Sequence, residues 1–519
     1  MKALPAEVDF VVIGAGVAGL RAAIELADAG RVLVISKQEP PEFKTKDRRS
    51  EAAWLSETDD VILHLQDTIA AGDGLSKPEA VKIMVDEGVE RIDELLTWGR
   101  HAGTNLSFEP ENAHTRSRVL HAASEPSGKE ILRILWDKVH SLKQVSVAQF
   151  TFATSLLTDA GRVTGVSLLD EKAVPHDISC SAVLLATGGC GQIYRNTSNP
   201  ESATADGIAL AVRAGAEVSD MEFVQFHPTA LHMKKVPQIL LPEGLRADGA
   251  YLRNFELDRF MGKYHPLGER APRDLVSRAI VHEMEVSRAK DPFVYLDLTH
   301  LNTTKVQKSF PFIYETCMAY NVDITEDVIP VRPAAYANAG GVRTDLDGKT
   351  NVNRLYAAGE VAATGVHGAN QLPSNSILES LVFGARAGRA MRNVEKISHQ
   401  PGEPKATYSN GPVDVGVEEL IGRIQDTMWK EVGVVRMRPG MQNAVTALEE
   451  MAPKLSQPRT RRAHEAANLH LAALLVARSA LAREESRGAH YRIDYSDHED
   501  RRFSRHSVIR GDKVLFPIT

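Results

Sequence analysis

A short apolar strand that runs directly into a glycine-rich turn constrains this chain more than any other feature. Residues 11–13 are apolar, residues 14–19 read Gly-Ala-Gly-Val-Ala-Gly, and we expect a helix over 20–29. In such a unit the first glycine permits the tight turn, the second lets the backbone approach a pyrophosphate, and the third lets helix and strand pack closely. The pattern therefore predicts a Rossmann-like dinucleotide site at the positive end of the helix dipole, formed by Gly14, Ala15, Gly16, Val17 and Gly19.

The second strand of this unit is expected at residues 31–35. Dinucleotide-binding folds usually place an acid at its end, where it binds the ribose. That acid is absent here, and Ser36 and Lys37 occupy the position.

Two later segments repeat the pattern of an apolar strand that ends in glycine. Residues 181–189 end in Thr-Gly-Gly, and residues 355–360 end in Gly-Glu before a helix expected over 376–391. Near-continuous apolar runs are typical of parallel strands buried on both faces. We therefore expect one α/β nucleotide-binding domain, formed by residues 1–222 and 346–396 and interrupted by an inserted domain at 223–345.

The chain beyond residue 396 changes character. Residues 397–414 are interpreted as a linker, and helical periodicity then predicts a helical domain over 415–519 with a charged tail from Asp497. A further amphipathic helix is expected over 80–98.

Composition excludes several classes of function. With 519 residues the chain is long enough for several domains, and a net charge of −7 without a basic stripe argues against nucleic-acid binding. No apolar stretch reaches membrane-spanning length, and we find no targeting segment. The 3 cysteines lack the spacing of a disulfide framework or a metal site, so Cys180 and Cys190 are interpreted as core residues. These features favour a cytoplasmic enzyme without a metal.

Several longer motifs resemble the flavoproteins of the fumarate reductase and succinate dehydrogenase superfamily, and within it the L-aspartate oxidases. They are 222–229 (Glu-Phe-Val-Gln-Phe-His-Pro-Thr), 271–274 (Ala-Pro-Arg-Asp), 367–370 (His-Gly-Ala-Asn) and 485–490 (Glu-Ser-Arg-Gly-Ala-His). The resemblance covers nearly the whole chain. It implies an FAD-binding domain of the glutathione-reductase type, interrupted by an α+β capping domain and followed by a C-terminal helical domain.

The resemblance also implies a reaction. L-Aspartate would be oxidised to iminoaspartate by hydride transfer to N5 of non-covalent FAD, with oxygen or fumarate as the acceptor that reoxidises the flavin. This is the first step of NAD biosynthesis through quinolinate, so the product would pass to quinolinate synthase. Such a site needs cations for two carboxylates and a group that moves a proton at the carbon being oxidised.

Four residues match the substrate site of the family. Arg273 matches the proton-transfer arginine, His227 a carboxylate contact, and Glu111 the acid that receives the substrate ammonium. Glu243, with Arg246, falls on the active-site loop. From sequence alone, Arg273 also fits a surface arginine paired with Asp274, His227 a structural histidine, and Glu111 an exposed acid.

Other matches concern the cofactor. Lys37 is expected near the adenosine ribose, and Ser376 and Ile377 at a helix start whose dipole favours electron-rich flavin atoms. The further residues implied to contact FAD are Ala153, Asp206 and Glu360.

The chain departs from the family at four places. Residues 44–51 carry charges where a glycine-containing segment normally wraps the flavin, and Pro242, Tyr336 and Gln371 replace a small or hydroxyl residue, a histidine and an arginine. Loss of a bidentate arginine–carboxylate contact costs roughly 1.5–3 kcal/mol. Two alternatives therefore stay open: a flavin-dependent oxidoreductase of another dicarboxylate or amino acid, and a flavoprotein impaired in catalysis.

Overall fold

The computed structural model describes residues 4–39, 52–53, 60–101, 106–109, 119–122, 127–234, 236, 238–396 and 416–518. The predicted linker lies entirely outside the described residues, as do residues 44–51 and Glu111.

A parallel sheet of 5 strands organises the nucleotide-binding part, in the order β17-β10-β1-β2-β6. Its strands are β1 (Phe10–Ile13), β2 (Val32–Ile35), β6 (Val145–Ala148), β10 (Ala182–Leu185) and β17 (Leu355–Ala357). β1 pairs with both β2 and β10, and β10 pairs with β17. The prediction that the three strand-to-glycine segments share one sheet is thus confirmed. Because parallel strands end at the same edge, their glycines meet there.

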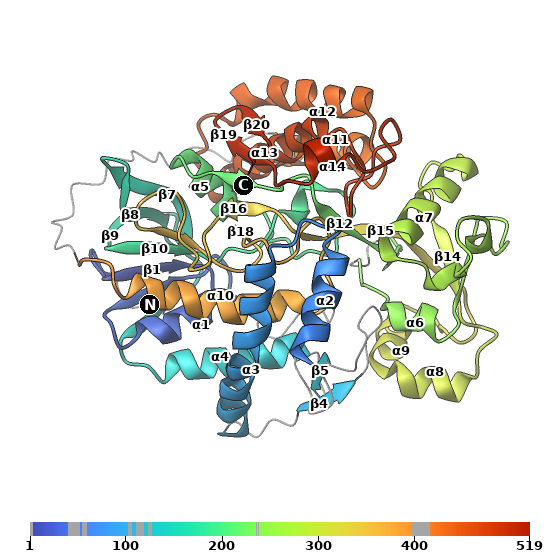
Figure 1. Ribbon diagram of the computed structural model, residues 1–519, viewed down its shortest axis with the longest axis horizontal. Helices are drawn as coiled ribbons and strands as arrows, with labels where there is room; N and C mark the ends of the chain where they lie inside the picture. The colour runs from blue at the N-terminus through green and yellow to red at the C-terminus, as the bar shows by residue number, and fades with distance from the viewer. Residues whose placement is uncertain are drawn as a thin grey trace.

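Alternate side chains of this sheet enter two separate cores. Val12, Val34 and Leu184 pack on one face against helices, whereas Val11, Leu33 and Val183 pack on the other against a second sheet and the C-terminal helices. The helices of the first face are α1 (Val17–Leu26), α3 (Pro78–His101), α4 (Ser127–His140) and α10 (Asn375–Met391). Figure 1 shows α10 running beside α1 beneath the sheet. The helices predicted at 80–98 and 376–391 are confirmed.

The first helix begins earlier than predicted. α1 starts at Val17 rather than residue 20 and ends at Leu26 rather than residue 29. The reason is that Gly16 is extended, with φ −81° and ψ −175°, and caps the helix, so the glycine motif itself forms its first turn.

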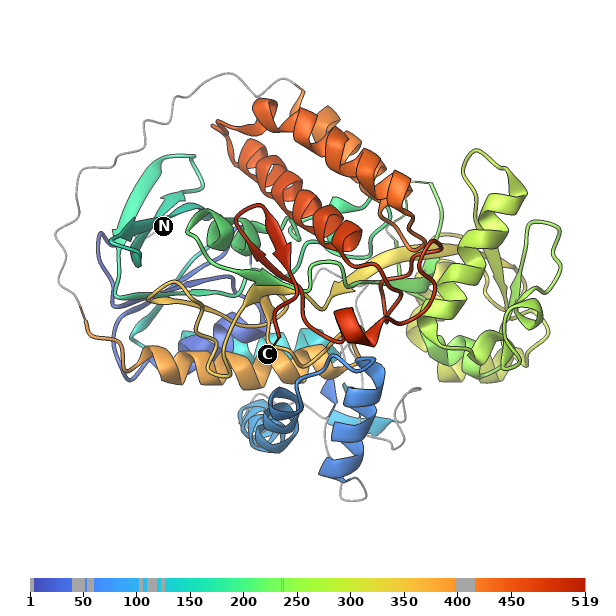
Figure 2. The same ribbon diagram turned by 45° about the horizontal axis from the view of Figure 1, so that its top comes forward.

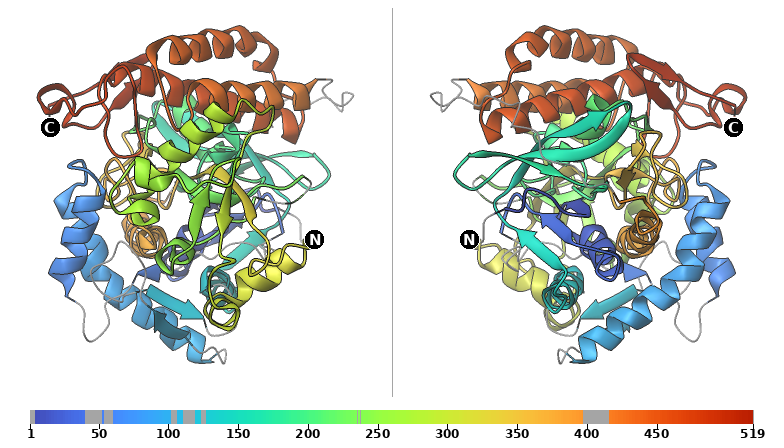
Figure 3. Two further views of the ribbon diagram at one scale, coloured as in Figure 1. Left: turned by 90° about the vertical axis from the view of Figure 1, so that its right-hand side faces the viewer. Right: turned by 90° about the vertical axis from the view of Figure 1, so that its left-hand side faces the viewer.

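The second face is covered by an antiparallel sheet of β7 (Phe152–Asp159), β8 (Arg162–Leu169) and β9 (Pro175–Ser179). The right-hand view of Figure 3 places this sheet between the parallel strands and the C-terminal helices. Three further elements complete this part: α2 (Val61–Ala71), α5 (Asp206–Arg213), and a small sheet of β3 (Ala52–Ala53), β4 (Leu106–Glu109) and β5 (Val119–Ala122).

The inserted segment forms a separate lobe with its own core, seen on the right of Figure 1 and facing the viewer on the left of Figure 3. Its sheet has the order β12-β15-β14-β13. The strands are β12 (Val224–Leu231), β13 (Tyr251–Arg253), β14 (Val294–Asp297) and β15 (Ile329–Asn338), and the helices are α6 (Glu243–Ala247), α7 (Arg273–Ser287), α8 (Thr303–Ser309) and α9 (Pro311–Met318). We call this lobe the cap; the exact domain boundaries stay a prediction.

Three helices, α11 (Val417–Glu431), α12 (Arg438–Met451) and α13 (Arg461–Ala482), form the C-terminal helical domain above the sheets (Figure 2). Ile421, Ile424 and Met428 are buried, as their spacing predicts.

The prediction of a charged tail from Asp497 is wrong. After α14 (Asp500–Phe503), strands β19 (Val508–Arg510) and β20 (Lys513–Leu515) join β11 (Val218–Ser219), β16 (Gly341–Arg343) and β18 (Ala362–Ala363) in one sheet. Val508 and Ile509 are buried there, and the charged residues around them obscured this short strand in the sequence.

Cys180, Cys190 and Cys317 are all buried thiols. Among the described residues, no helix has the length and apolar character needed to cross a lipid bilayer.

Candidate functional site

A cavity of about 820 Å³ opens where the parallel strands end. The glycine turn and the start of α1 form one side, and residues that follow β2, β10 and β17 form the others. Of the predicted cofactor residues, those that line it are Gly14, Ala15, Gly16, Val17, Lys37, Ala153, Asp206 and Glu360. Position, size and lining fit an extended dinucleotide at the edge where α/β sheets bind such ligands.

Two glycines of the turn have different physical roles. Gly14 has φ +116°, and a Cβ there would lie 2.1 Å from the carbonyl oxygen of Ala186, so no side chain fits. Gly16 has an ordinary φ, and a Cβ there would meet no protein atom within 4 Å. Its missing side chain therefore leaves space at the helix N-terminus, where backbone N–H groups can donate hydrogen bonds to a phosphate.

Three predicted cofactor residues do not line this cavity. Gly19 packs behind the turn, where a Cβ would lie 2.0 Å from the carbonyl oxygen of Gly14. Ser376 and Ile377 lie in the first turn of α10, and Ser380, one turn later, reaches the cavity instead. Phe152, Ser380 and Arg461 line the cavity but were not predicted. Phe152 adjoins the predicted Ala153, whereas nothing in the sequence places Arg461 beside the glycine turn.

A second group of side chains brings together residues from four elements of the cap. Arg273, the first residue of α7, places Nε 2.6 Å from Glu243 Oε1, at the start of α6. Its Nη1 lies 3.4 Å from Gln225 Oε1 in β12, and its guanidinium carbon lies 5.7 Å from the ring centre of Tyr336 in β15. Asp274 pairs instead with Arg278. The interpretation of Arg273 as a surface residue paired with its neighbour is therefore wrong.

Glu243 is held between two cations. Arg246, one turn further along α6 and buried, lies 3.2 Å from the same Oε1. Burial disfavours the carboxylate, but the charges of Arg273 and Arg246 outweigh it and lower the pKa of Glu243 to about 2. The carboxylate is thus ionised throughout the neutral range and fixes both guanidiniums in place.

His227 lies in the same cluster, and its imidazole is neutral. Burial and the nearby charge of Arg273 lower its pKa to about 3. The backbone N–H of Thr229 donates to its Nδ1 at 3.3 Å, so the neutral ring carries its proton on Nε2. Its ring centre lies 6.1 Å from that of Tyr336. The side chain therefore offers a donor but no charge.

The cluster reaches the cofactor cavity through β15. The backbone N–H of Asn338 donates to Glu360 Oε1 at 3.2 Å, and Asn338 lies two residues after Tyr336. Glu360 itself lines the cavity. Strand β15 thus connects the cluster around Arg273, through Tyr336, with the wall of the cofactor cavity, through Asn338.

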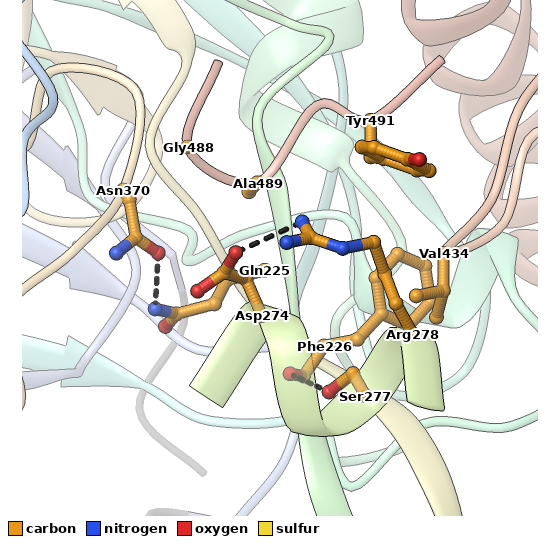
Figure 4. A pocket seen from close by; sticks show the side chains of 10 residues that line it. All are labelled: Gln225, Phe226, Asp274, Ser277, Arg278, Asn370, Val434, Gly488, Ala489 and Tyr491. Atoms are coloured by element: carbon orange, nitrogen blue, oxygen red, sulfur yellow. Dashed lines mark hydrogen bonds and ion pairs between the residues drawn. The ribbon is translucent and has the colours of Figure 1, made fainter. Parts of the chain in front are cut away.

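A small cavity of about 20 Å³ marks where the cap, the sheet domain and the C-terminal domain meet (Figure 4). On one side of it, the Gln225 amide donates to Asn370 Oδ1 at 2.7 Å. On the other, Arg278 pairs with Asp274 at 2.9 Å and stacks over Tyr491 at 4.5 Å. Figure 4 shows Gln225 directed toward Asn370 while Arg278 turns toward Tyr491. The cap is therefore fastened to both other domains beside the cluster.

The structure also places the residues that depart from the family pattern. Tyr336 lies in the cluster, Pro242 caps α6 directly before Glu243, and Gln371 is buried, with its backbone oxygen accepting from Gln225 Nε2 at 3.1 Å. The placement of Glu111 and of residues 44–51 lies outside the described residues.

Comparison with known proteins identifies both parts of the chain. Residues 9–377 match the FAD binding domain family, and residues 422–515 match the fumarate reductase flavoprotein C-terminal family. L-Aspartate oxidase 2-b, chloroplastic, from Nicotiana tabacum is 40% identical over 95% of this chain and 82% of its own length. L-Aspartate oxidase from Streptomyces coelicolor is 39% identical over 97% of this chain and 91% of its own. The solved structure of an E. coli quinol fumarate reductase variant has a TM-score of 0.85 at 30% identity, covering 97% of this chain and 94% of that one.

Proposed function

The chain belongs to the L-aspartate oxidase family, within the fumarate reductase and succinate dehydrogenase flavoproteins, and on that premise we propose that it oxidises L-aspartate to iminoaspartate. The observation that carries this proposal is the Arg273–Glu243 pair, 2.6 Å apart on the cap and joined through β15 to the cofactor cavity. FAD is the cofactor.

The described residues fit FAD. The N–H groups around Gly16 at the start of α1 would hold the pyrophosphate, and Glu360 would receive hydroxyl groups of the cofactor. When bound, FAD supplies two-electron oxidation, for which we propose oxygen or fumarate as the final electron acceptor.

Arg273 provides the charge that a dicarboxylate requires. Because Glu243 stays ionised, it keeps Arg273 both oriented and cationic. A cation whose side chain is only 13% exposed attracts a substrate carboxylate strongly. Oxidation of the amine removes a hydride from Cα and a proton from nitrogen. We propose, by resemblance, that Arg273 relays that proton: as the guanidinium takes up the proton from the substrate nitrogen, it passes its own Nε proton to Glu243, 2.6 Å away, and so is cationic before and after the step.

The second carboxylate would be held by neutral donors. His227 offers its Nε2–H, and Tyr336 adds a phenol in the same cluster. Glu111 completes the proposal as the acid that receives the substrate ammonium. Together these groups would distinguish an amino dicarboxylate from a simple dicarboxylate by charge.

A second candidate is an oxidoreductase of another dicarboxylate or amino acid. Tyr336 beside Arg273 favours it, because a phenol replaces the histidine that normally binds a carboxylate. A phenol and an amide also accept a neutral polar group, so a substrate with only one carboxylate would suit this cluster.

An anaerobic absorbance titration separates these candidates. The purified protein should be yellow, and L-aspartate should bleach the flavin band, with peroxide formed when air is admitted. Arg273→Ala should keep the yellow colour and lose the bleaching. Bleaching by another acid but not by aspartate would establish the second candidate, and a protein that cannot be loaded with FAD would refute both.

Two finer points belong to the same proposal. We propose that the product passes to quinolinate synthase for NAD biosynthesis. An imine hydrolyses in water, so rapid consumption by the next enzyme would limit its loss. We also propose a cytoplasmic enzyme, in keeping with its buried, unpaired thiols. To test the first point, the quinolinate yield with both enzymes present from the start is compared with the yield when quinolinate synthase is added after the oxidation. A higher yield is expected when both are present together.

A further inference from the structure

The wall of the cofactor cavity includes one residue from the C-terminal helical domain. Among the described residues that line the cavity, all but Arg461 lie between Ile13 and Ser380. Arg461 is the first residue of α13, and Thr460 caps that helix by accepting from the backbone N–H of Ala463. A residue far along the chain is therefore fixed beside the nucleotide-binding strands.

Arg461 is anchored at the end of β2. Its Nη1 donates to the backbone oxygen of Lys37 at 2.6 Å, and its Nε donates to Glu465 Oε1 at 3.2 Å. The guanidinium carbon lies 5.9 Å from the ring centre of Phe152, and the side chain is 38% exposed. These two hydrogen bonds hold the guanidinium in a defined position. Its remaining N–H donors are therefore held beside the cavity.

Lys37, by contrast, is already engaged. Its ammonium lies 2.6 Å from Thr204 Oγ1, 2.7 Å from Asp206 Oδ2 and 3.3 Å from Glu465 Oε1. An ammonium has three N–H donors, so these oxygens use its whole capacity. In the described part of the chain, Arg461 Nη2 has no such partner. Of the two cations at this end of the cavity, Arg461 is the one with donors to offer a ligand.

We propose that Arg461 binds the adenosine half of FAD. The end of β2 is where this fold places the nucleotide ribose, while the pyrophosphate belongs at the glycine turn. A planar guanidinium there can donate to ribose hydroxyls or a phosphate oxygen and stack on adenine. The usual acid after β2 is missing, and Arg461 supplies the polar contact from another domain. The proposal rests on FAD as cofactor and is independent of the substrate.

Affinities of the apoprotein for FAD and for its two halves test the assignment. Arg461→Ala should raise the Kd for FAD about 10- to 100-fold, the loss expected for a hydrogen bond to a charged group. It should raise the Kd for ADP by a similar factor and leave the Kd for FMN, which lacks the adenosine, within twofold of wild type. Arg461→Lys, which keeps the charge, should recover part of the FAD affinity.

Arg462→Ala is the matched control. Arg462 lies in the same turn and pairs with Glu418 and with Glu465 Oε2, the oxygen that Arg461 does not contact, and it does not line the cavity. Removing it should leave the Kd for FAD unchanged. An unchanged FAD affinity in Arg461→Ala, or equal losses for FAD and FMN, would overturn the assignment, because either result would mean that Arg461 serves the packing of α13 alone. A wild-type protein that binds FAD but does not oxidise aspartate would refute the proposed function and leave this inference standing.

Discussion

The two ends of the active site are built by different means. The cofactor cavity lies where neighbouring parallel strands end, with the glycine turn as one of its sides. The cluster around Arg273, by contrast, consists of side chains from β12, α6, α7 and β15. At the first end, geometry excludes side chains, as Gly14 illustrates. At the second, paired charges such as Arg273 and Glu243 define the chemistry. We therefore expect cofactor binding at the glycine turn to tolerate substitutions at other positions. Substrate binding by paired charges should instead be altered by a single substitution.

The largest expected effect is that of Arg273→Ala. Loss of the cation and proton-transfer group should lower kcat/KM for aspartate about 10³- to 10⁴-fold, while FAD remains bound. Steady-state peroxide formation and the flavin spectrum measure the two quantities. Arg278→Ala, one turn along α7 and engaged with Tyr491, serves as the control and should change kcat/KM less than about tenfold. Similar losses in both variants would mean that the cap, rather than the charge, had been disturbed.

The two glycines sharpen the contrast at the cofactor end. Gly14→Ala should destabilise the folded protein by several kcal/mol, roughly the cost of strain at a special backbone position together with a clash. Gly16→Ala should leave apoprotein stability within about 0.5 kcal/mol but weaken FAD binding, because its Cβ enters the cofactor space. Thermal unfolding of the apoproteins and FAD titration distinguish the two. Equal stability losses would contradict the separation of roles.

Tyr336→Phe measures the smaller contribution of one hydroxyl group to substrate binding. The ring centre of Tyr336 lies 5.7 Å from the guanidinium carbon of Arg273, and removing the phenol oxygen should raise KM for aspartate about threefold to tenfold, the loss of a hydrogen bond worth about 0.5–1.5 kcal/mol. The FAD Kd should not change. An unchanged KM would show that Tyr336 does not contact the substrate, and the second candidate function would then lose its main support.

The smallest effect concerns pH. With a pKa of about 3, His227 stays neutral between pH 5 and 8, so its NMR resonance, identified by comparison with His227→Gln, should not move in that range. The pKa is lower than the ordinary 6.5, so the stability this neutral histidine contributes is complete above pH 6.5 and is lost as pH falls toward 3. A resonance that titrates near pH 6.5 would mean that His227 carries charge in the site.

This contrast also explains what could be predicted from the sequence. The glycine turn is local, so residues 14–17 and the presence of three parallel strands in one sheet could be predicted from pattern alone. Arg273 and Glu243 were identified through motifs, but their 2.6 Å contact depends on the folding of α6 against α7. Arg461 carried no signal, because its place in the cavity depends on how α13 packs on distant strands. The β19 pairing was missed because two buried residues among charges resemble a tail.

The strand pairing of β11 has a consequence for biosynthesis. β11, at Val218–Ser219, lies between β16 and β19, so this strand pairs with a segment that is translated long after it. Contacts between such distant positions form slowly because a long loop must first close. The sheet therefore stays incomplete until residues 508–510 have been synthesised, and we expect it to form late in folding.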